Sequence, residues 1–115
     1  MKRDFVKTAM LLDLYGELLS QKQKICLELY YHEDYSLTEI AQLQGITPQG
    51  AKYNISQGFD VLIRREEQLG FLARLETISE TLLTVQAQLE AIRAKHPAAA
   101  DALSAVSQQL EQLSF

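Results

Sequence analysis

The chain has 115 residues, an apolar fraction of 47% and a formal net charge of −4. That length fits one domain, or one domain with an appendage, and the apolar content is sufficient for a core. The sequence has no run of 18 apolar residues, which predicts no membrane span. Charged residues interrupt the N-terminal apolar stretch, so we expect no signal peptide. The single cysteine, Cys26, has no internal partner for a disulfide, and we expect a cytoplasmic protein.

Charge is distributed unevenly along the chain. Residues 1–65 carry eight basic and eight acidic side chains, whereas residues 66–115 carry three basic and seven acidic ones. The whole acidic excess therefore lies in the C-terminal part. An N-terminal part with no net charge lacks the strongly basic surface expected of a tight duplex-binding protein.

Two helices are predicted in the first third of the chain. Residues 3–19 carry a broad apolar surface at helical spacing, which indicates contacts on more than one side of the first helix. Ser20 and Gln23 have the spacing of a capping box, which predicts a second helix over Gln21–Tyr31. The residues expected to face inward on it are Ile25, Cys26, Leu29 and Tyr30.

The middle of the chain contains a series of helix-start and turn signals. Ser36 and Glu39 have the spacing of another capping box. Gly45 suits a tight turn that needs a positive φ. Thr47 is favoured as an N-cap and Pro48 as the first residue of the helix that follows.

Apolar residues recur at helical spacing on both sides of this turn. The inward positions are expected to be Leu37, Ile40, Ala41 and Leu43 before it, and Ala51, Ile55, Phe59 and Leu62 after it. Ile46 can fill the angle between the two helices, and the second helix is expected to run on toward Gly70. Caps, turn and periodicity together predict a helix-turn-helix.

A different apolar pattern begins at Phe71. Residues alternately four and three apart form a seam of three heptads: Phe71, Leu75, Ile78, Leu82, Val85, Leu89 and Ile92. A helix over Phe71–Arg93 would be about 34 Å long. Burial of each seam side chain contributes about 1.5–3 kcal/mol, so we expect this helix to have a partner surface. Pro97 ends or kinks it. A last helix, Ala98–Leu113, repeats the seam with Ala99, Leu103, Val106, Leu110 and Leu113.

The partner surface has two possible sources, the last helix folded back or the same helix of a second subunit. Positions beside the long seam are mainly uncharged, which favours a helical bundle between subunits over a two-stranded coiled coil. We therefore expect a homodimer through the C-terminal helices. The predicted architecture is all-α, with a helix-turn-helix domain over residues 1–70 and a helical oligomerisation extension over residues 71–115.

The segment LLDLYGELLSQKQKICLELYYHEDYSLTEIAQLQGITPQGAKYNI resembles the YlxM family of small bacterial helix-turn-helix proteins. Its fold is similar to that of a winged-helix or sigma-factor region-4 domain. Members of the family are encoded beside components of the signal recognition particle. The resemblance therefore implies a DNA-binding regulatory protein linked to that pathway, and its motifs lie within about residues 10–70.

The chain differs from the family in its recognition helix. That helix usually opens Ser-Arg-Gln-Ala-Val, whereas here Thr47, Pro48, Gln49, Gly50 and Ala51 stand in those places. The arginine is thus replaced by proline. A basic pair usually follows Asp-Asn-Ile, and the corresponding residues here are Ser-Gln.

The start of the second helix of the motif is the candidate DNA-reading surface, because this part of a helix-turn-helix lies in the major groove. The exposed residues expected there are Thr47, Gln49, Lys52, Tyr53, Ser56 and Gln57. Gln49 can bond adenine in bidentate fashion, and Lys52 can reach guanine or phosphate. The side chains that can touch the DNA backbone are Lys22, Lys24, Arg64 and Arg65.

Two alternatives that do not involve DNA reading remain open for this surface. It can be an ordinary solvated face, or it can dock on a protein or RNA component of the signal recognition particle without reading duplex DNA. The cluster of Tyr30, Tyr31 and Tyr35 can stack on single-stranded RNA, but at helical spacing it is more often core. Gly50 and Gly58 indicate close helix crossing in preference to ligand approach.

The rest of the sequence indicates neither a metal site nor a catalytic site. His32, Glu33 and Asp34 lack a second cluster that would complete a metal site. Cys26 lies on an apolar helix face, where a buried, inert thiol is expected. The sequence shows no catalytic triad, phosphate-binding glycine loop or paired carboxylates, so we expect no catalytic residue, metal or cofactor.

Overall fold

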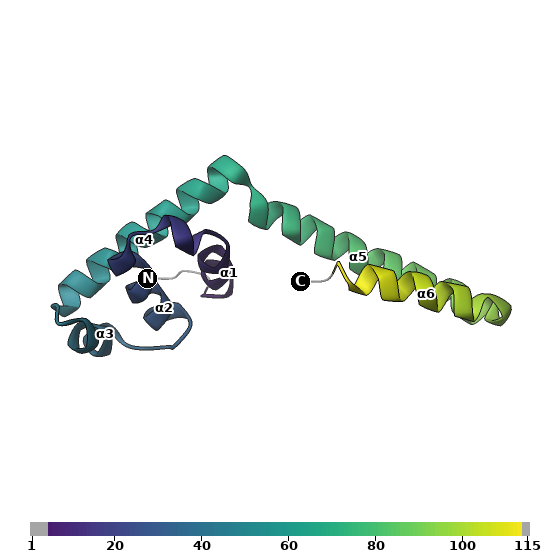
Figure 1. The fold of residues 1–115 in the computed structure, drawn as a ribbon, viewed down its shortest axis with the longest axis horizontal. Helices are drawn as coiled ribbons and strands as arrows, with labels where there is room; N and C mark the ends of the chain where they lie inside the picture. The colour runs from purple at the N-terminus through teal and green to yellow at the C-terminus, as the bar shows by residue number, and fades with distance from the viewer. Residues whose placement is uncertain (1–4, 114–115) are drawn as a thin grey trace. The chain divides into compact units, whose positions relative to one another are not determined.

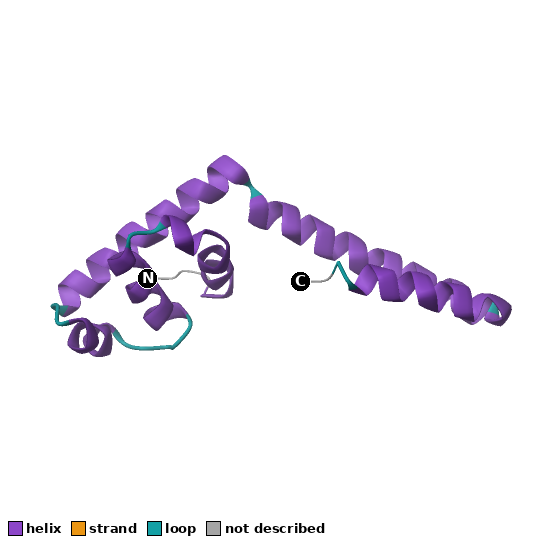
Figure 2. Ribbon diagram, in the orientation of Figure 1, coloured by secondary structure: helices purple, strands orange, loops and turns teal. Residues whose placement is uncertain are grey.

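A computed structural model describes residues 5–113 of the chain. All regular structure in this range is helical, and no strand occurs there (Figure 2). The all-α class is therefore confirmed, and the described residues carry no β wing. The helices in chain order are α1 (Phe5–Tyr15), the 3₁₀ turn η1 (Gly16–Leu18), α2 (Gln21–Tyr31), α3 (Leu37–Gln44), α4 (Pro48–Leu69), α5 (Phe71–Lys95), the 3₁₀ turn η2 (Pro97–Ala99) and α6 (Ala100–Glu111) (Figure 1).

The helices form two compact units, one extending to Leu72 and one starting at Ala73. We call the first unit, residues 5–72, the head, and the second, residues 73–113, the hairpin. In the head, α4 lies against each of α1, α2 and α3. Its fully buried positions, Ala51, Ile55 and Leu62, fill the centre of the core. The other core residues are Leu11, Leu12, Tyr15, Cys26, Leu27, Ile40 and Leu72.

The predicted helix starts of the head are confirmed. The amide of Gln23 donates to Ser20 Oγ at 3.3 Å, and the amide of Ser20 donates to Gln23 Oε1 at 3.2 Å. Ser36 and Glu39 exchange the same pair of bonds, each at 3.1 Å. Each capping box satisfies amides that the first turn of a helix leaves without partners.

The first helix is shorter than predicted. It ends at Tyr15 and is followed by a 3₁₀ turn, whereas the apolar periodicity extends it to residue 19. Leu19 is extended, with φ −86° and ψ 157°, because the chain has to leave the helical path before Ser20 can cap α2. Residues 3 and 4 of the predicted helix lie outside the described residues.

Two inward-facing predictions also differ from the structure. Leu43 is 59% exposed, because it lies about 200° around α3 from Ala41, which faces the core. Leu27, which the periodicity of α2 did not select, is fully buried, whereas Ile25, Leu29 and Tyr30 are only half-buried.

Leu27 is buried because α2 and α4 cross closely at Gly58. A Cβ atom added to Gly58 would lie 2.5 Å from Leu27 Cδ1 and 3.2 Å from Gln23 Cβ. The crossing explanation is therefore confirmed for Gly58. It is wrong for Gly50, whose nearest neighbours are the side chains of Thr47 and Ile46 in the turn before its own helix.

The tyrosines before the motif belong to the core of the head. Tyr30, Tyr31 and Tyr35 are half-buried and pack against the buried cluster. The ring of Phe5 lies 5.6 Å from that of Tyr30 and 4.9 Å from that of Tyr31, centroid to centroid. Aromatic rings at these distances contribute packing energy beyond the area that they bury.

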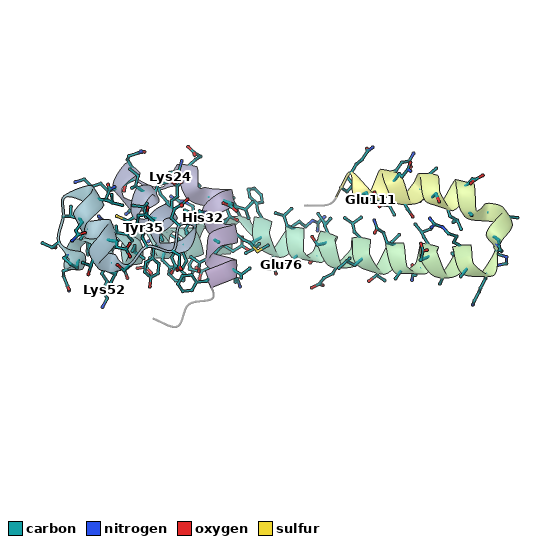
Figure 3. The ribbon with its side chains drawn as sticks, turned by 90° about the horizontal axis from the view of Figure 1, so that it is seen from below. Lys24, His32, Tyr35, Lys52, Glu76 and Glu111 are labelled. Atoms are coloured by element: carbon teal, nitrogen blue, oxygen red, sulfur yellow. The ribbon has the colours of Figure 1, made fainter. Side chains whose placement is uncertain are left out.

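In the hairpin, α5 and α6 lie side by side and run in opposite directions (Figures 1 and 3). The last helix begins two residues later than predicted, because Pro97–Ala99 forms a 3₁₀ turn, and it ends at Glu111. No side chain from Ala73 to Leu113 is buried. The predicted seam is thus only half-covered within one hairpin.

Candidate nucleic-acid interface

The angle between α3 and α4 is fixed by backbone geometry at three successive residues. Gly45 adopts a left-handed conformation, with φ 66° and ψ 34°, and ends α3. The amide of Ile46 donates to the carbonyl of Ala41 at 3.0 Å, and the half-buried Ile46 packs against the core. Thr47 Oγ1 accepts a hydrogen bond from the amide of Gly50 at 3.0 Å and caps α4. This turn holds the start of α4 in a defined position on the head.

The predicted reading surface lies on the outward side of the first three turns of α4. We call it the reading ridge and define it by Thr47, Gln49, Lys52, Tyr53, Ser56 and Gln57. Five of these side chains are exposed, and Ser56 is half-exposed. Tyr53 is 64% exposed, although it is a large aromatic residue. Lys52 projects from the outer surface of the helix (Figure 3).

The opposite side of the same turns anchors the ridge. Ala51 and Ile55 are fully buried, and the partly buried side-chain amide of Asn54 donates to Cys26 Sγ at 3.8 Å. Burial raises the pKa of the Cys26 thiol, which fits the prediction of an inert cysteine. The ridge is therefore carried by a helix whose inner face is packed, and its orientation does not depend on a flexible loop.

Three of the four predicted backbone-contacting cations are engaged elsewhere or lie far along α4 from the ridge, and the fourth, Lys22, is exposed. Lys24 forms an ion pair with Glu17, which raises the pKa of the lysine and lowers that of the carboxyl. Arg65 Nη1 donates to Gln68 Oε1 at 2.8 Å. Arg64 and Arg65 lie twelve and thirteen residues beyond Lys52, about 18 Å further along α4. Lys52 is therefore the one cation that the ridge itself carries.

The structure extends the polar surface to the end of α3, which the sequence did not indicate. Gln42, Leu43 and Gln44 are exposed immediately before the turn. The two glutamines flanking Leu43 were the available signal, since a polar–apolar–polar ending is unusual for a helix face that packs inward. Gln42 and Gln44 add uncharged hydrogen-bonding groups next to the ridge in sequence.

Residues 5–113 contain neither a cluster of metal-binding side chains nor a membrane-spanning helix. No group of three or more histidine, cysteine, aspartate or glutamate side chains is arranged to hold a metal ion. The imidazole of His32 instead lies with Nε2 3.2 Å from Asp13 Oδ1. Among the helices of residues 5–113, none combines the length and the hydropathy of a membrane-spanning segment.

These features define a helix-turn-helix protein with four helices in its head and a two-helix extension. The model of the family UPF0122, described as "Putative helix-turn-helix protein, YlxM / p13 like", matches residues 2–101. The chain belongs to this family.

Relatives in the family match over most of the chain. A UPF0122 protein of Acetivibrio thermocellus is 35% identical over 109 residues, which is 93% of each chain. One from a Thermoanaerobacter species is 33% identical over 117 aligned positions that span both chains completely. A third, from Caldanaerobacter subterraneus, is 39% identical over 74 residues, 64% of this chain and 63% of its own. The resemblance seen in the sequence is thereby confirmed.

Proposed function

We propose that the protein is a DNA-binding regulator that acts by binding and not by catalysis. The observation that carries this proposal is the exposed reading ridge at the start of a helix whose other face is packed. In helix-turn-helix proteins this segment enters the major groove and its side chains reach base edges. An exposed, polar and rigidly supported ridge meets that geometric requirement.

The chemistry of the ridge favours readout by hydrogen bonds over attraction to phosphate. Gln49 offers a donor and an acceptor that match adenine in the major groove, and Lys52 can reach guanine or a phosphate. One cation on the ridge gives a weak electrostatic contribution, because each phosphate neutralised by a cation adds to affinity. A homodimer through the C-terminal helices would double these contacts and place two ridges on two half-sites.

The resemblance to the YlxM family supports a place for this activity in the cytoplasm, in connection with the signal recognition particle pathway. The low charge of the ridge favours one alternative. In it, the same surface docks on a protein or RNA component of the particle and never reads a duplex. Both proposals use the same residues, so they are separated by the partner that is bound.

The test is co-purification of the full-length chain from its native cells, with bound nucleic acid and bound protein both identified. The regulator proposal predicts duplex fragments that share a sequence, retained at low salt. The Gln49→Ala variant should discriminate less at one base position, by about 1–3 kcal/mol. Gln108→Ala, at an exposed position of α6, is the matched control. Recovery of particle RNA or protein without any duplex would instead support the alternative.

A further inference from the structure

The two helices of the hairpin face each other through half of their apolar seam. On α5 the facing residues lie seven apart in two rows, Leu75, Leu82 and Leu89 in one and Ser79, Gln86 and Arg93 in the other, and all are partly buried. On α6 the partly buried residues include Ala100, Leu103, Ser104, Ser107 and Leu110. Each helix therefore presents one apolar row and one polar or small row to the other.

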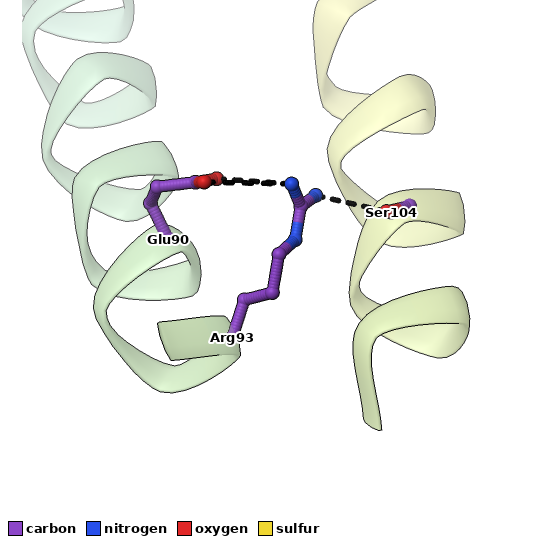
Figure 4. Close-up of polar contacts among 3 residues, drawn as sticks. All are labelled: Glu90, Arg93 and Ser104. Atoms are coloured by element: carbon purple, nitrogen blue, oxygen red, sulfur yellow. Dashed lines mark hydrogen bonds and ion pairs between the residues drawn. The ribbon is translucent and has the colours of Figure 1, made fainter. Parts of the chain in front are cut away.

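The polar rows make the hairpin contact a weak one. Arg93 lies between the helices, where Nη2 donates to Ser104 Oγ at 2.9 Å and Nη1 approaches Glu90 Oε1 at 3.4 Å (Figure 4). Its Nε atom is buried without a hydrogen-bond partner among the described residues. A buried donor without a partner opposes the association that buries it. The contact between α5 and α6 is thus not a dry core that would make the hairpin stable alone.

The other half of the seam stays open. It consists of a second row on each helix, again seven residues apart: Ile78, Val85 and Ile92 on α5, and Ala99, Val106 and Leu113 on α6. Ile92 is 45% exposed, Val106 42% and Leu113 56%. Ile78, Val85 and Ala99 are partly buried, as are the leucines of the facing rows. All the exposed seam residues of the hairpin nevertheless belong to the open rows, which are therefore the less covered part of the apolar surface.

Both open rows lie on the same side of the hairpin. The helices run in opposite directions, and each turns the same edge of its seam toward the other. In that arrangement the remaining edges point to one side. The exposed residues that border this side form one further row on each helix: Thr81 and Gln88, with Arg74 and Lys95 at the two ends of the row, on α5, and Ala102 and Gln109 on α6. The border is therefore uncharged along its middle. We call this side the open face.

We propose that a second copy of the chain covers the open face. Two hairpins pack face to face about a two-fold axis and form a four-helix bundle whose core is made of both rows from all four helices. This inference rests on the homodimer in the proposed function and specifies its interface. It also explains why a segment of about 40 residues, near the lower limit for an independent core, has no buried side chain.

A second copy is favoured over an unrelated partner because the open face is complementary to itself. A two-fold interface brings the same surface of each subunit together, so it needs a surface without opposing like charges. The aliphatic rows and the uncharged middle of their borders meet this condition, because the two cations of the α5 border, Arg74 and Lys95, lie at its ends. Four-helix bundles bury the same kind of seam at positions that repeat with the heptad.

The test is the mass in solution of the full-length chain without DNA, measured by light scattering or sedimentation equilibrium. The native chain should have twice its subunit mass of 13.0 kDa. The Val106→Glu variant should halve the measured mass at the same concentration. Because Val106 is 42% exposed within one chain, the substitution should leave the helical circular dichroism of the head in place.

Two controls identify the face. Ala105→Glu and Ala87→Glu place the same charge at exposed positions beside the rows but off the open face, and should leave the dimer intact. Met10→Glu tests the exposed apolar surface of α1, where Val6 and Met10 are 71% and 45% exposed. A native monomer, or a dimer that Met10→Glu dissociates and Val106→Glu does not, would overturn the inference. Neither result would bear on whether the head binds DNA, which is measured separately.

Discussion

The hydroxyl of Tyr15 donates a hydrogen bond to Glu66 Oε1 at 2.7 Å and so joins the end of α1 to the last turns of α4. The same two side chains receive the first amides of α5. The amide of Phe71 donates to the Tyr15 hydroxyl at 3.2 Å, and that of Leu72 donates to Glu66 Oε1 at 3.0 Å. Residues from two other helices therefore cap α5, directly after the left-handed Gly70.

Removing the Tyr15 hydroxyl should destabilise the head. In Tyr15→Phe the Glu66 carboxylate loses a donor and the Phe71 amide loses its acceptor, and both hydrogen bonds are partly buried. We expect a loss of about 1–3 kcal/mol in the free energy of unfolding, measured in urea. Tyr53→Phe, on the exposed ridge, should change it by less than about 0.5 kcal/mol. Equal effects of the two variants would show that the cap of α5 does not stabilise the head.

Tyr15 should also make the head sensitive to alkaline pH. Burial, followed by the hydrogen bond to Glu66, raises the pKa of the Tyr15 phenol above its ordinary value of 10.0. The protonated phenol is thus favoured in the folded state. Its contribution is complete below about pH 10 and is lost as the pH rises through the raised pKa. Urea unfolding between pH 9 and 11 should show a steeper loss of stability for the native chain than for Tyr15→Phe.

Replacing Gly58 with alanine should lower the stability of the head, although alanine itself favours a helix. Alanine is better than glycine within a helix by about 1 kcal/mol. The added Cβ would lie 2.5 Å from Leu27 Cδ1, however, so the fully buried Leu27 side chain would have to leave its packed position or the crossing of α2 and α4 would have to open. We expect Gly58→Ala to destabilise the head by about 1–3 kcal/mol.

A double-mutant cycle with Leu27→Ala tests whether the crossing is the cause. Truncating Leu27 removes the atom that the new methyl group would strike. The two substitutions should therefore be non-additive, with a coupling of about 0.5–3 kcal/mol. If Gly58→Ala stabilised the chain, or if the two effects simply added, close crossing would not be the role of this glycine.

The motif could be predicted from the sequence because its signals are local. Capping boxes, the left-handed Gly45 and Pro48 at the start of α4 each depend on neighbouring residues only. The burial of Leu27 and the exposure of Leu43 depend on which helix crosses at which residue, and a periodic pattern does not contain that information. The network of Tyr15 and Glu66 joins residues 51 positions apart, so no spacing rule indicates it.

The stability of the start of α3 should fall at acid pH, because the Glu39 carboxylate takes part in its cap. Hydrogen bonds from the backbone and side chain of Ser36 lower the pKa of the Glu39 carboxyl below its ordinary value of 4.5. A lowered pKa stabilises the fold above about pH 4.5 and loses that effect as the pH falls through the lowered value. Ser36→Ala should cost about 1 kcal/mol at neutral pH. Glu39→Gln should make the free energy of unfolding depend less steeply on pH in the acid range. An unchanged dependence would contradict the role of Glu39 in this cap.

The central claim is that the reading ridge of α4 contacts a duplex. The most direct test is the affinity for duplex DNA measured at increasing salt. The probes are a labelled duplex recovered with the native protein and an unrelated duplex of equal length. The variants are Lys52→Gln on the ridge and Lys95→Gln at an exposed position of α5. Both variants remove one positive charge, so net charge alone cannot distinguish them.

If Lys52 neutralises a phosphate, Lys52→Gln should reduce the slope of log affinity against log salt by about 0.9. Lys95→Gln should leave the slope unchanged, and the recovered duplex should bind more tightly than the unrelated one. If Lys52 contacts a guanine, affinity for the recovered duplex alone should fall by about 1–3 kcal/mol. No retention of either duplex at low salt, or equal effects of the two lysines, would contradict the account.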